Sequence, residues 1–286
     1  MKYALVTGAT GGLGGEVAKA LAAQGWFVFA AGRSEKALEN IENNTPCHAL
    51  KLDITDQASI DAALETVKET TDHLDALINF SGVQKMASLI EGDVEIVQSM
   101  IDVNLMGMVR MNKTFFPLVK AVNGRIINCS SECGWMTPQP FNGPYTLSKY
   151  AVEAYNESLR RELMFLDIPV IKVQPGSFKT AMHGSTTASF DKLIGETNWY
   201  RDVLETMKVM MQLELKMAND PKYLVEAVLE AVSTDKPKQN YRVKNSPILG
   251  MVELVPSNLL DKMYKGILKS KKVSNIMAKI SEKITD

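Results

Sequence analysis

The sequence predicts an α/β protein whose core is a doubly wound parallel sheet, and three observations carry this prediction. Short apolar runs alternate with stretches of helical pattern along most of the 286 residues, as they do in sheets built from strand–helix–strand units. The runs are apolar throughout, which is typical of strands buried on both faces. A glycine-rich segment joins the first run to the first helix, as a tight turn at the edge of such a sheet requires.

The expected strands and helices follow one another in chain order. Strands are expected where β-branched and apolar residues cluster: KYALVTG (2–8), FVFAAG (27–32), HALKLD (48–53), LDALINF (74–80), RIINCS (125–130) and PVIKVQP (169–175). Helices are expected in the longer periodic stretches between them, at 13–24, 57–70, 92–121 and 144–166. A helix at 221–233 and a last strand at 240–243 follow.

The chain is expected to form one domain, 1–245, followed by a C-terminal helical extension, 246–286. Within the domain, residues 184–218 are rich in Met, Leu and Trp but interrupted by glycine and small polar residues. One interpretation is a cover over a binding site, with an adaptable apolar lining made by Met182, Trp199, Tyr200, Met207, Met210 and Met211. The other is a helix that simply packs on the core.

Composition limits the partners and the setting. With 32 basic and 33 acidic residues the chain has almost no net charge, so no nucleic-acid partner is expected. The three cysteines and three histidines form no cluster with metal-ligand spacing, so no metal is expected; His183 is expected to be a surface residue. The sequence has neither a signal-peptide core at its N-terminus nor an apolar run of about 18 residues. A reducing, cytoplasmic setting is therefore expected.

The segment VTGATGGLGGEVA leaves the first strand and opens the first helix. Glycines there allow a tight turn and let a pyrophosphate approach the free N–H groups of the helix N-terminus. Two spacings fit: TGxxxGxG uses Thr7, Gly8, Gly12 and Gly14, and TGxxGxxG uses Gly11 in place of Gly12. The loop predicts a dinucleotide site but does not choose between two branches of dinucleotide-binding enzymes.

The end of the second strand indicates which dinucleotide is bound. NAD sites usually place an acid here to hold the adenosine ribose, whereas this chain continues from Gly32 to Arg33 and Ser34. No carboxylate would repel a 2′-phosphate, Arg33 can pair with it, and Ser34 can hydrogen-bond to it. We therefore predict NADP, the alternative being that Arg33 is only a solvated loop cation.

Two later strand ends add polar residues to the same edge of the sheet. Asp53 closes the third expected strand, and Asn79 to Gly82 close the fourth. In a doubly wound sheet the ligand lies beyond the carboxyl ends of the strands, so these residues are candidates for cofactor contact. Asp53 could instead cap the helix that starts near Asp56, and Gly82 could be an ordinary turn glycine.

A candidate proton-handling group follows the fifth strand. Ser130 and Ser131 end that strand, and Tyr145 and Lys149 stand four residues apart on one face of the next helix. A free tyrosine has a pKa of about 10. A neighbouring ammonium is expected to lower the pKa of Tyr145 and make it a usable general acid or base, while a serine hydroxyl binds the substrate oxygen.

The ordered set of Thr7-Gly8, Gly12-Leu13-Gly14, Asn79 to Gly82, Asn104 in DVNLMG, Ser131, Tyr145, Lys149 and PGSFKT (175–180) resembles the short-chain dehydrogenase/reductase family over residues 2–243. The resemblance implies a Rossmann fold and favours the TGxxxGxG spacing. It also implies a list of cofactor-binding residues: Gly8, Thr10, Gly12, Leu13, Gly14, Arg33, Ser34, Asp53, Ile54, Asn79, Ser81, Gly82, Tyr145, Lys149, Pro175, Gly176, Phe178 and Thr180.

The resemblance further implies a division of roles at the reacting end. Tyr145 would exchange a proton with an alcohol or carbonyl, Lys149 would hold the nicotinamide ribose, and Ser131 would orient the substrate. Asn104 would fix a water in a proton relay to Lys149.

Two departures from the family pattern stand out. The usual NNAG is Asn79-Phe80-Ser81-Gly82 here, which changes the packing under the adenine. The interval of 14 residues from Ser131 to Tyr145 is one longer than the commonest spacing, so Ser130 remains an alternative to Ser131.

Substrate and partners follow from the tail and from the resemblance. NYRVKNSPILGMVELVPSNLLDKM resembles the C-terminal segments of hydroxysteroid- and retinol-type members, which implies a lipophilic alcohol, ketone or aldehyde as substrate. From Ser257 to Asp286 there are seven lysines and three acids, so the tail is expected to make weak contact with an anionic membrane, dock on a partner subunit or form a solvated helix. The resemblance implies a homodimer or homotetramer.

Alternative functions are a non-catalytic nucleotide-binding regulator, or an epimerase or dehydratase of the related extended branch.

Overall fold

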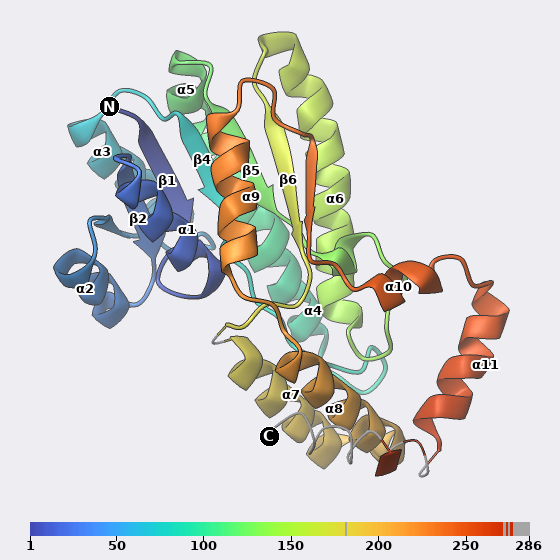
Figure 1. The fold of residues 1–286 in the computed structure, drawn as a ribbon. Helices are drawn as coiled ribbons and strands as arrows, with labels where there is room; N and C mark the ends of the chain where they lie inside the picture. Colours follow the sequence, from blue (N-terminus) through green and yellow to red (C-terminus); the bar gives the residue numbers. More distant parts are fainter. Residues whose placement is uncertain (181, 271–272, 274, 277–286) are drawn as a thin grey trace.

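The computed structural model describes residues 1–180, 182–270, 273 and 275–276, without the side chains of Met182, His183, Ser185 and Ile248. Within these residues the chain forms one sheet of seven strands, all parallel, in the order β3-β2-β1-β4-β5-β6-β7 (Figure 1). The strands are β1 (Tyr3–Thr7), β2 (Phe27–Gly32), β3 (His48–Lys51), β4 (Ala76–Asn79), β5 (Arg125–Cys129), β6 (Val170–Pro175) and β7 (Asn240–Val243). The predicted doubly wound sheet is confirmed. The strand order reverses between β1 and β4, which is where such sheets bind their ligands.

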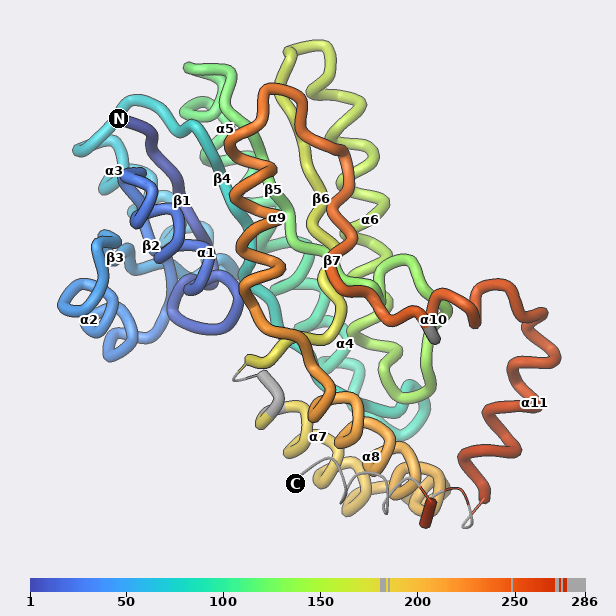
Figure 2. The backbone as a smooth tube through the Cα atoms, viewed as in Figure 1, coloured from blue at the N-terminus to red at the C-terminus, as the bar shows by residue number. Residues whose placement is uncertain are grey.

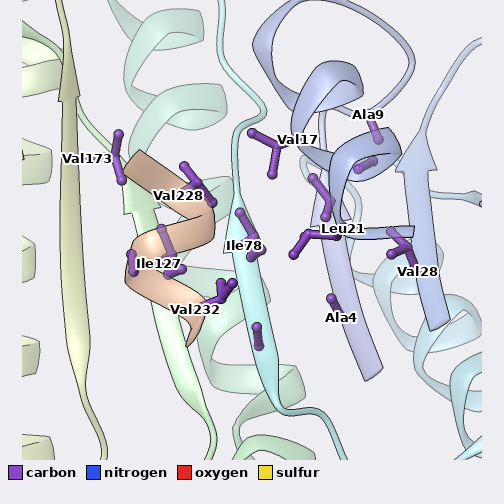
Figure 3. Packing of buried hydrophobic residues seen from close by; sticks show 14 of the residues in the cluster. Ala4, Ala9, Val17, Leu21, Val28, Ile78, Ile127, Val173, Val228 and Val232 are labelled. Atoms are coloured by element: carbon purple, nitrogen blue, oxygen red, sulfur yellow. The ribbon is translucent and has the colours of Figure 1, made fainter. Parts of the chain in front are cut away.

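Helices cover both faces of the sheet and bury two apolar clusters. On one face, α1 (Gly12–Ala23) and α9 (Lys222–Ser233) pack against the strands, and Figure 3 shows Val17 and Val228 from these helices above Ile78. On the other face, α3 (Gln57–Thr70), α5 (Gly107–Ala121) and α6 (Gly143–Leu163) bury a second cluster. The strands read as apolar because each lies between these two clusters.

The helix α2 (Glu35–Asn44) has no counterpart among the predicted elements. It is short and mostly polar, and its buried face consists of only two side chains, Leu38 and Ile41. Ser34 caps it by accepting a hydrogen bond from the Ala37 N–H, and serine is a preferred N-cap residue. Asp56 caps α3 in the same way, through Ala58.

The predicted helix 92–121 is interrupted. It consists of α4 (Val94–Ile101), a π-helical turn at Asp102–Met106 and α5. A π-turn inserts an extra residue into a helix and is common at functional sites. Here it carries Asn104, which is fully buried.

Residues 184–218 fold as two helices, α7 (Met182–Glu196) and α8 (Arg201–Lys216), which lie beyond the carboxyl ends of the strands (Figure 1). They share a third apolar cluster built on Phe190, Leu204 and Met207. Met210, Met211 and Tyr200 pack against this cluster, whereas Trp199 is 70% exposed. The segment thus has its own small apolar core, separate from the clusters on the two faces of the sheet.

The extension forms α10 (Pro247–Val252) and α11 (Ser257–Leu268). Figure 2 shows it leaving β7, passing beside α6 and turning down toward α8. Leu268 of α11 belongs to the same apolar cluster as α7 and α8. Among the helices of the described ranges, none is both long and apolar enough to cross a bilayer.

Candidate active site

The glycine loop after β1 is shaped by two close backbone approaches. Gly8 has φ 71°, and a Cβ there would lie 2.8 Å from the Ser81 nitrogen. A Cβ on Gly14 would lie 2.7 Å from the Gly8 oxygen. Gly12, with φ 56°, has nothing within 4 Å of its Cβ position, whereas Gly11 is extended with φ 175°. The three glycines of the TGxxxGxG spacing are therefore the ones that this backbone requires.

The loop is tied to the end of β4. The Thr7 hydroxyl accepts hydrogen bonds from the Phe80 and Ser81 N–H groups, each at 3.1 Å. Leu13 packs against the cluster under α1. The open side of the loop, beside Gly12, thus faces outward with the N–H groups at the start of α1 next to it, which is the arrangement that a pyrophosphate needs.

The end of β2 carries Arg33 as predicted. Its guanidinium lies 3.8 Å from the Asp53 carboxylate and its side chain is 64% exposed. Thr10 lies over Gly32, where a Cβ would come within 2.1 Å of it. The Ser34 hydroxyl already caps α2.

Asp53 turns back on its own loop. Its Oδ1 accepts hydrogen bonds from the Thr55 N–H at 2.9 Å and the Thr55 hydroxyl at 2.7 Å. Partial burial disfavours its ionised form, but these bonds and the Arg33 charge hold the pKa of Asp53 below its ordinary value. Asp53 does not cap α3, since Asp56 does so.

Beyond the end of β5, Ser131, Tyr145 and Lys149 come together. The Ser131 side chain faces the Tyr145 phenol, close enough to lower its pKa, and its hydroxyl accepts the Cys133 N–H at 3.2 Å. The Lys149 ammonium donates to the Cys129 carbonyl at 3.0 Å and lies 5.7 Å from the centre of the Tyr145 ring. Tyr145 is partly exposed, whereas Lys149 is buried.

Ser130 points elsewhere. Its N–H continues the ladder to the Val173 carbonyl at 2.8 Å, and its hydroxyl is buried with no hydrogen-bond partner among the described residues. A Cβ on Gly134 would lie 2.8 Å from that hydroxyl. Between the two serines, Ser131 is the one that lies against Tyr145.

The pKa of Tyr145 differs from the sequence-based expectation. Burial raises it strongly above the ordinary value, and the hydrogen bond from Ser131 offsets only part of this shift. Burial also lowers the pKa of Lys149, whose ammonium is turned to the Cys129 carbonyl. The loss of solvent is thus the largest influence on both groups, and the expected lowering of the Tyr145 pKa is not found.

Asn104 fastens the loop after β4. Its side-chain nitrogen donates to the Val83 carbonyl and the Ser148 hydroxyl, each at 2.9 Å, and its oxygen accepts the Val83 N–H at 2.8 Å. A Cβ on Gly82 would lie 3.3 Å from the Asn104 oxygen and 3.9 Å from the Lys149 ammonium. Gly82 therefore allows a close approach, and the bonds of the Asn104 side chain go to Val83 and Ser148 rather than to Lys149.

Asn79 belongs to a buried amide network that the sequence did not reveal. Its nitrogen donates to Asn112 at 2.7 Å and Asn128 at 2.8 Å, and Asn128 donates to Asn156 at 2.9 Å. These residues come from β4, α5, β5 and α6. The asparagine inside the apolar strand RIINC was the available signal, since a polar side chain there must find a partner.

The segment after β6 is held against the end of β7. The Gly176 N–H donates to the Val243 carbonyl at 2.9 Å, and a Cβ there would lie 2.2 Å from the Lys244 oxygen. Phe178 is 3% exposed within the cluster under α9. The Ile54 side chain is likewise buried, so neither side chain is free to cover a cofactor. Pro175 ends β6, and Thr180 is partly exposed just before the undescribed residue 181.

Glu132 is a second residue that the sequence reasoning missed. It directly follows Ser131, is 5% exposed, and accepts the Ser246 N–H at 2.8 Å. Burial, reinforced by the charge of Glu214 on α8, raises its pKa to about 7. Its signal was an acid beside the serine pair in an otherwise apolar and small-residue stretch.

The groups available here suit proton exchange and hydrogen bonding to oxygen. Within the described ranges no set of three or more His, Cys, Asp and Glu side chains is placed to hold a metal ion.

Comparisons with known proteins agree with this geometry. Residues 2–190 match the family model described as short chain dehydrogenase. An NADPH-dependent 3-dehydrocapnine reductase from Ornithobacterium rhinotracheale is 31% identical over 286 residues, which cover 94% of this chain and 98% of that protein. Human retinol dehydrogenase 16 is 31% identical over 258 residues, covering 84% of this chain and 80% of that protein.

Solved structures support the fold. A variant of actinorhodin polyketide ketoreductase, crystallised with NADPH, superposes with a TM-score of 0.70 at 24% identity, covering 84% of this chain and 95% of that one. The resemblance inferred from the motifs is confirmed by the family model and the relatives. The chain belongs to the short-chain dehydrogenase family.

Proposed function

We propose that the chain is an NADP-dependent oxidoreductase that interconverts a lipophilic alcohol and the corresponding ketone or aldehyde. The observation that carries this proposal is the meeting of the Ser131 hydroxyl, the Tyr145 phenol and the Lys149 ammonium at the sheet edge that also holds the glycine loop. A regulator without turnover would have no need of this group.

NADP, when bound, supplies or accepts the hydride. The pyrophosphate fits the loop at Gly8 and Gly12, whose left-handed backbones leave the space beside Gly12 open. Arg33 would hold the 2′-phosphate, since its exposed guanidinium has only the distant Asp53 as a partner among the described residues. The NADPH dependence in the name of the bacterial relative supports the same cofactor.

The side chains divide the remaining work. A phenol is protonated at neutral pH, so the Tyr145 hydroxyl is the proton donor to a carbonyl oxygen during reduction. Ser131 donates a second hydrogen bond to that oxygen and so stabilises the charge that develops on it. Lys149 adds a positive charge beside the ring as the phenol loses its proton, and Asn104 keeps the adjoining loop in place.

A lipophilic substrate is supported by the lining of α7 and α8. Tyr200, Met210 and Met211 pack around their shared cluster, together with Met86 and Phe141 from loops at the sheet edge. Such side chains offer an adaptable apolar wall. Relatives named for retinol and hydroxysteroid substrates point to the same class.

The test is an NADPH-consumption screen across aliphatic, steroid and retinoid carbonyl compounds, with Tyr145→Phe as the blank. We expect turnover of at least one lipophilic carbonyl compound and a loss of about 10²- to 10⁴-fold in the blank. Absence of turnover in all classes, or a blank as active as the native chain, would contradict the proposal.

A homodimer or homotetramer is proposed through α4, α5 and α6. These helices and their adjoining turns carry exposed apolar side chains: Val94, Met106, Leu147, Met164 and Phe165. Their burial between subunits would stabilise an oligomer. Light scattering should report a dimer or larger species, and Leu147→Glu should shift it toward the monomer without unfolding it.

Weak contact with an anionic membrane, by a chain that we place in the cytoplasm, is proposed through α10 and α11. The extension exposes Met251, Leu254 and Met263 and also the lysines Lys262 and Lys269, and such a mixture of apolar and basic side chains is typical of interfacial helices. The four lysines beyond residue 270 lie outside the described residues. Sedimentation with anionic vesicles should exceed that with neutral ones, and Met263→Asp should abolish the difference.

A further inference from the structure

The C-terminal extension is fastened to the segment that joins Ser131 to Tyr145. At one end of α10, the Ser246 N–H donates to the Glu132 carboxylate at 2.8 Å. Just beyond the other end, Glu253 accepts the Thr137 N–H. The extension therefore holds the segment 132–137 at both of its ends, across sequence separations of 114 and 116 residues.

The held segment has little structure of its own. Residues 132–134 make a single 3₁₀ turn, closed by the Gly134 N–H to the Ser131 carbonyl at 3.0 Å. On its other side, a Cβ on Gly134 would lie 3.0 Å from the Lys149 carbonyl of α6. The turn that begins at Ser131 is thus sandwiched between the catalytic helix and the extension.

Glu132 is an unusual residue for this place. Its side chain is almost completely buried and forms no ion pair among the described residues. Its charged neighbour on α8, Glu214, repels it. A buried carboxylate without a cation is costly unless hydrogen bonds compensate, and the Ser246 N–H is the hydrogen-bond partner that the structure provides.

We propose that Glu132 is a positioning residue, which through its hydrogen bond to the Ser246 N–H holds the Ser131 turn against the extension and so keeps the Ser131 hydroxyl on Tyr145. The proposal rests on the oxidoreductase function proposed above. It makes the extension part of the active-site framework.

The same extension also reaches the cover of the site. Tyr264, Ile267 and Leu268 of α11 pack into the cluster that α7 and α8 share. One continuous segment thus contacts both the serine turn and the helices beyond the sheet edge.

The test removes each half of the hydrogen bond separately. Glu132→Ala removes the acceptor, and Ser246→Pro removes the donor at a residue whose φ of −64° suits proline. Two matched controls keep the bond: Glu132→Gln retains an acceptor oxygen, and Ser246→Ala loses only the hydroxyl that accepts from the Leu249 N–H.

We expect Glu132→Ala and Ser246→Pro each to lower kcat about tenfold, with an unchanged Kd for NADPH by fluorescence titration. Hydrogen exchange of peptide 131–137 should rise in both, and the double variant should be no worse than either single variant. The two controls should stay within about twofold of the native chain.

Wild-type kcat in folded Glu132→Ala or Ser246→Pro would overturn the proposal. So would a Glu132→Gln variant as impaired as Glu132→Ala, because the charge rather than the hydrogen bond would then matter. If Glu132→Ala does not fold, Glu253→Ala at the exposed far end serves instead, with Glu253→Gln as its control; unchanged exchange at 131–137 overturns the proposal. If the native chain turns over no carbonyl compound, the oxidoreductase function fails, while the exchange measurements still decide whether the bond holds the turn.

Discussion

The two halves of the site, one at the glycine loop after β1 and one at the serine turn after β5, are built in different ways. The glycine-loop half depends on Gly8 and Gly14, which stand in one short motif even though Gly8 approaches the distant Ser81 backbone. The serine half depends on a side chain that meets a backbone group 114 residues away, Glu132 with Ser246. The first kind of constraint leaves a pattern in neighbouring residues, and the second leaves none. Substitutions at four residues, two in each half, test this difference.

The largest effect is expected within the serine half. Ser131→Ala should lower kcat/KM by about 10²- to 10³-fold, as the loss of one hydrogen bond to a developing oxyanion does. Ser130→Ala is the matched control, because that hydroxyl has no partner within the described residues and points toward Gly134. Steady-state kinetics with the best substrate of the screen measures both. A larger loss in Ser130→Ala would reverse the assignment.

The next effect concerns stability and pH. The pKa of Glu132 is raised to about 7 from an ordinary 4.5, so the folded state keeps a proton that the unfolded chain has lost. Stability should therefore fall as pH rises from about 4.5 to 7, by up to ~3 kcal/mol, and then level off. Urea unfolding at several pH values should show a flatter profile for Glu132→Gln. An unchanged profile would mean that Glu132 is solvated.

A smaller effect is expected in the glycine half. Gly8→Ala places a Cβ 2.8 Å from the Ser81 nitrogen at φ 71°, and should lower the free energy of unfolding by about 2 kcal/mol. Gly11→Ala, at an extended and open position, should lower it less, by about 1 kcal/mol, because alanine is a poorer N-cap than glycine. Chemical unfolding of the two variants side by side measures the difference. Equal losses of stability in the two variants would favour the TGxxGxxG spacing, which uses Gly11.

The smallest effect is expected at the exposed end of the cofactor half. NADPH should bind about tenfold more tightly than NADH, and Arg33→Asp should reverse this preference, because a carboxylate repels a 2′-phosphate and accepts ribose hydroxyls. Titration calorimetry with both cofactors measures the ratio. A variant that still prefers NADPH would place the phosphate contact on another residue.

Much of the fold could be read from the sequence because its strands are buried on both faces. Each of the seven predicted strands matches an observed one to within three residues at either end. The helix α2 was not predicted, because only two of its side chains are buried and its sequence is mostly polar. The π-turn at Asn104 escaped because it leaves the apolar periodicity almost unchanged.

The site could be located but not fully described. Motif spacing brought Ser131, Tyr145 and Lys149 together, yet the direction of the Tyr145 pKa shift depends on burial, which no spacing reveals. Ser130 and Ser131 are neighbours in sequence, and only the turn after β5 separates their directions. Glu132 required knowledge of where residue 246 returns to the sheet edge.

The buried asparagines beneath the site bear on how helix α6 finds its place. Apolar side chains tolerate many dockings, since one close packing can replace another at small cost. The amides of Asn79, Asn128 and Asn156 do not, because their bonds form only in one alignment of β4, β5 and α6. If α6 were shifted by one turn, several buried amides would lose their hydrogen-bond partners, at a cost of about 1–3 kcal/mol each. The network therefore fixes the position of α6 along β5. Because α6 also carries Tyr145 and Lys149, the asparagines disfavour shifted arrangements in which these two residues would not face the site.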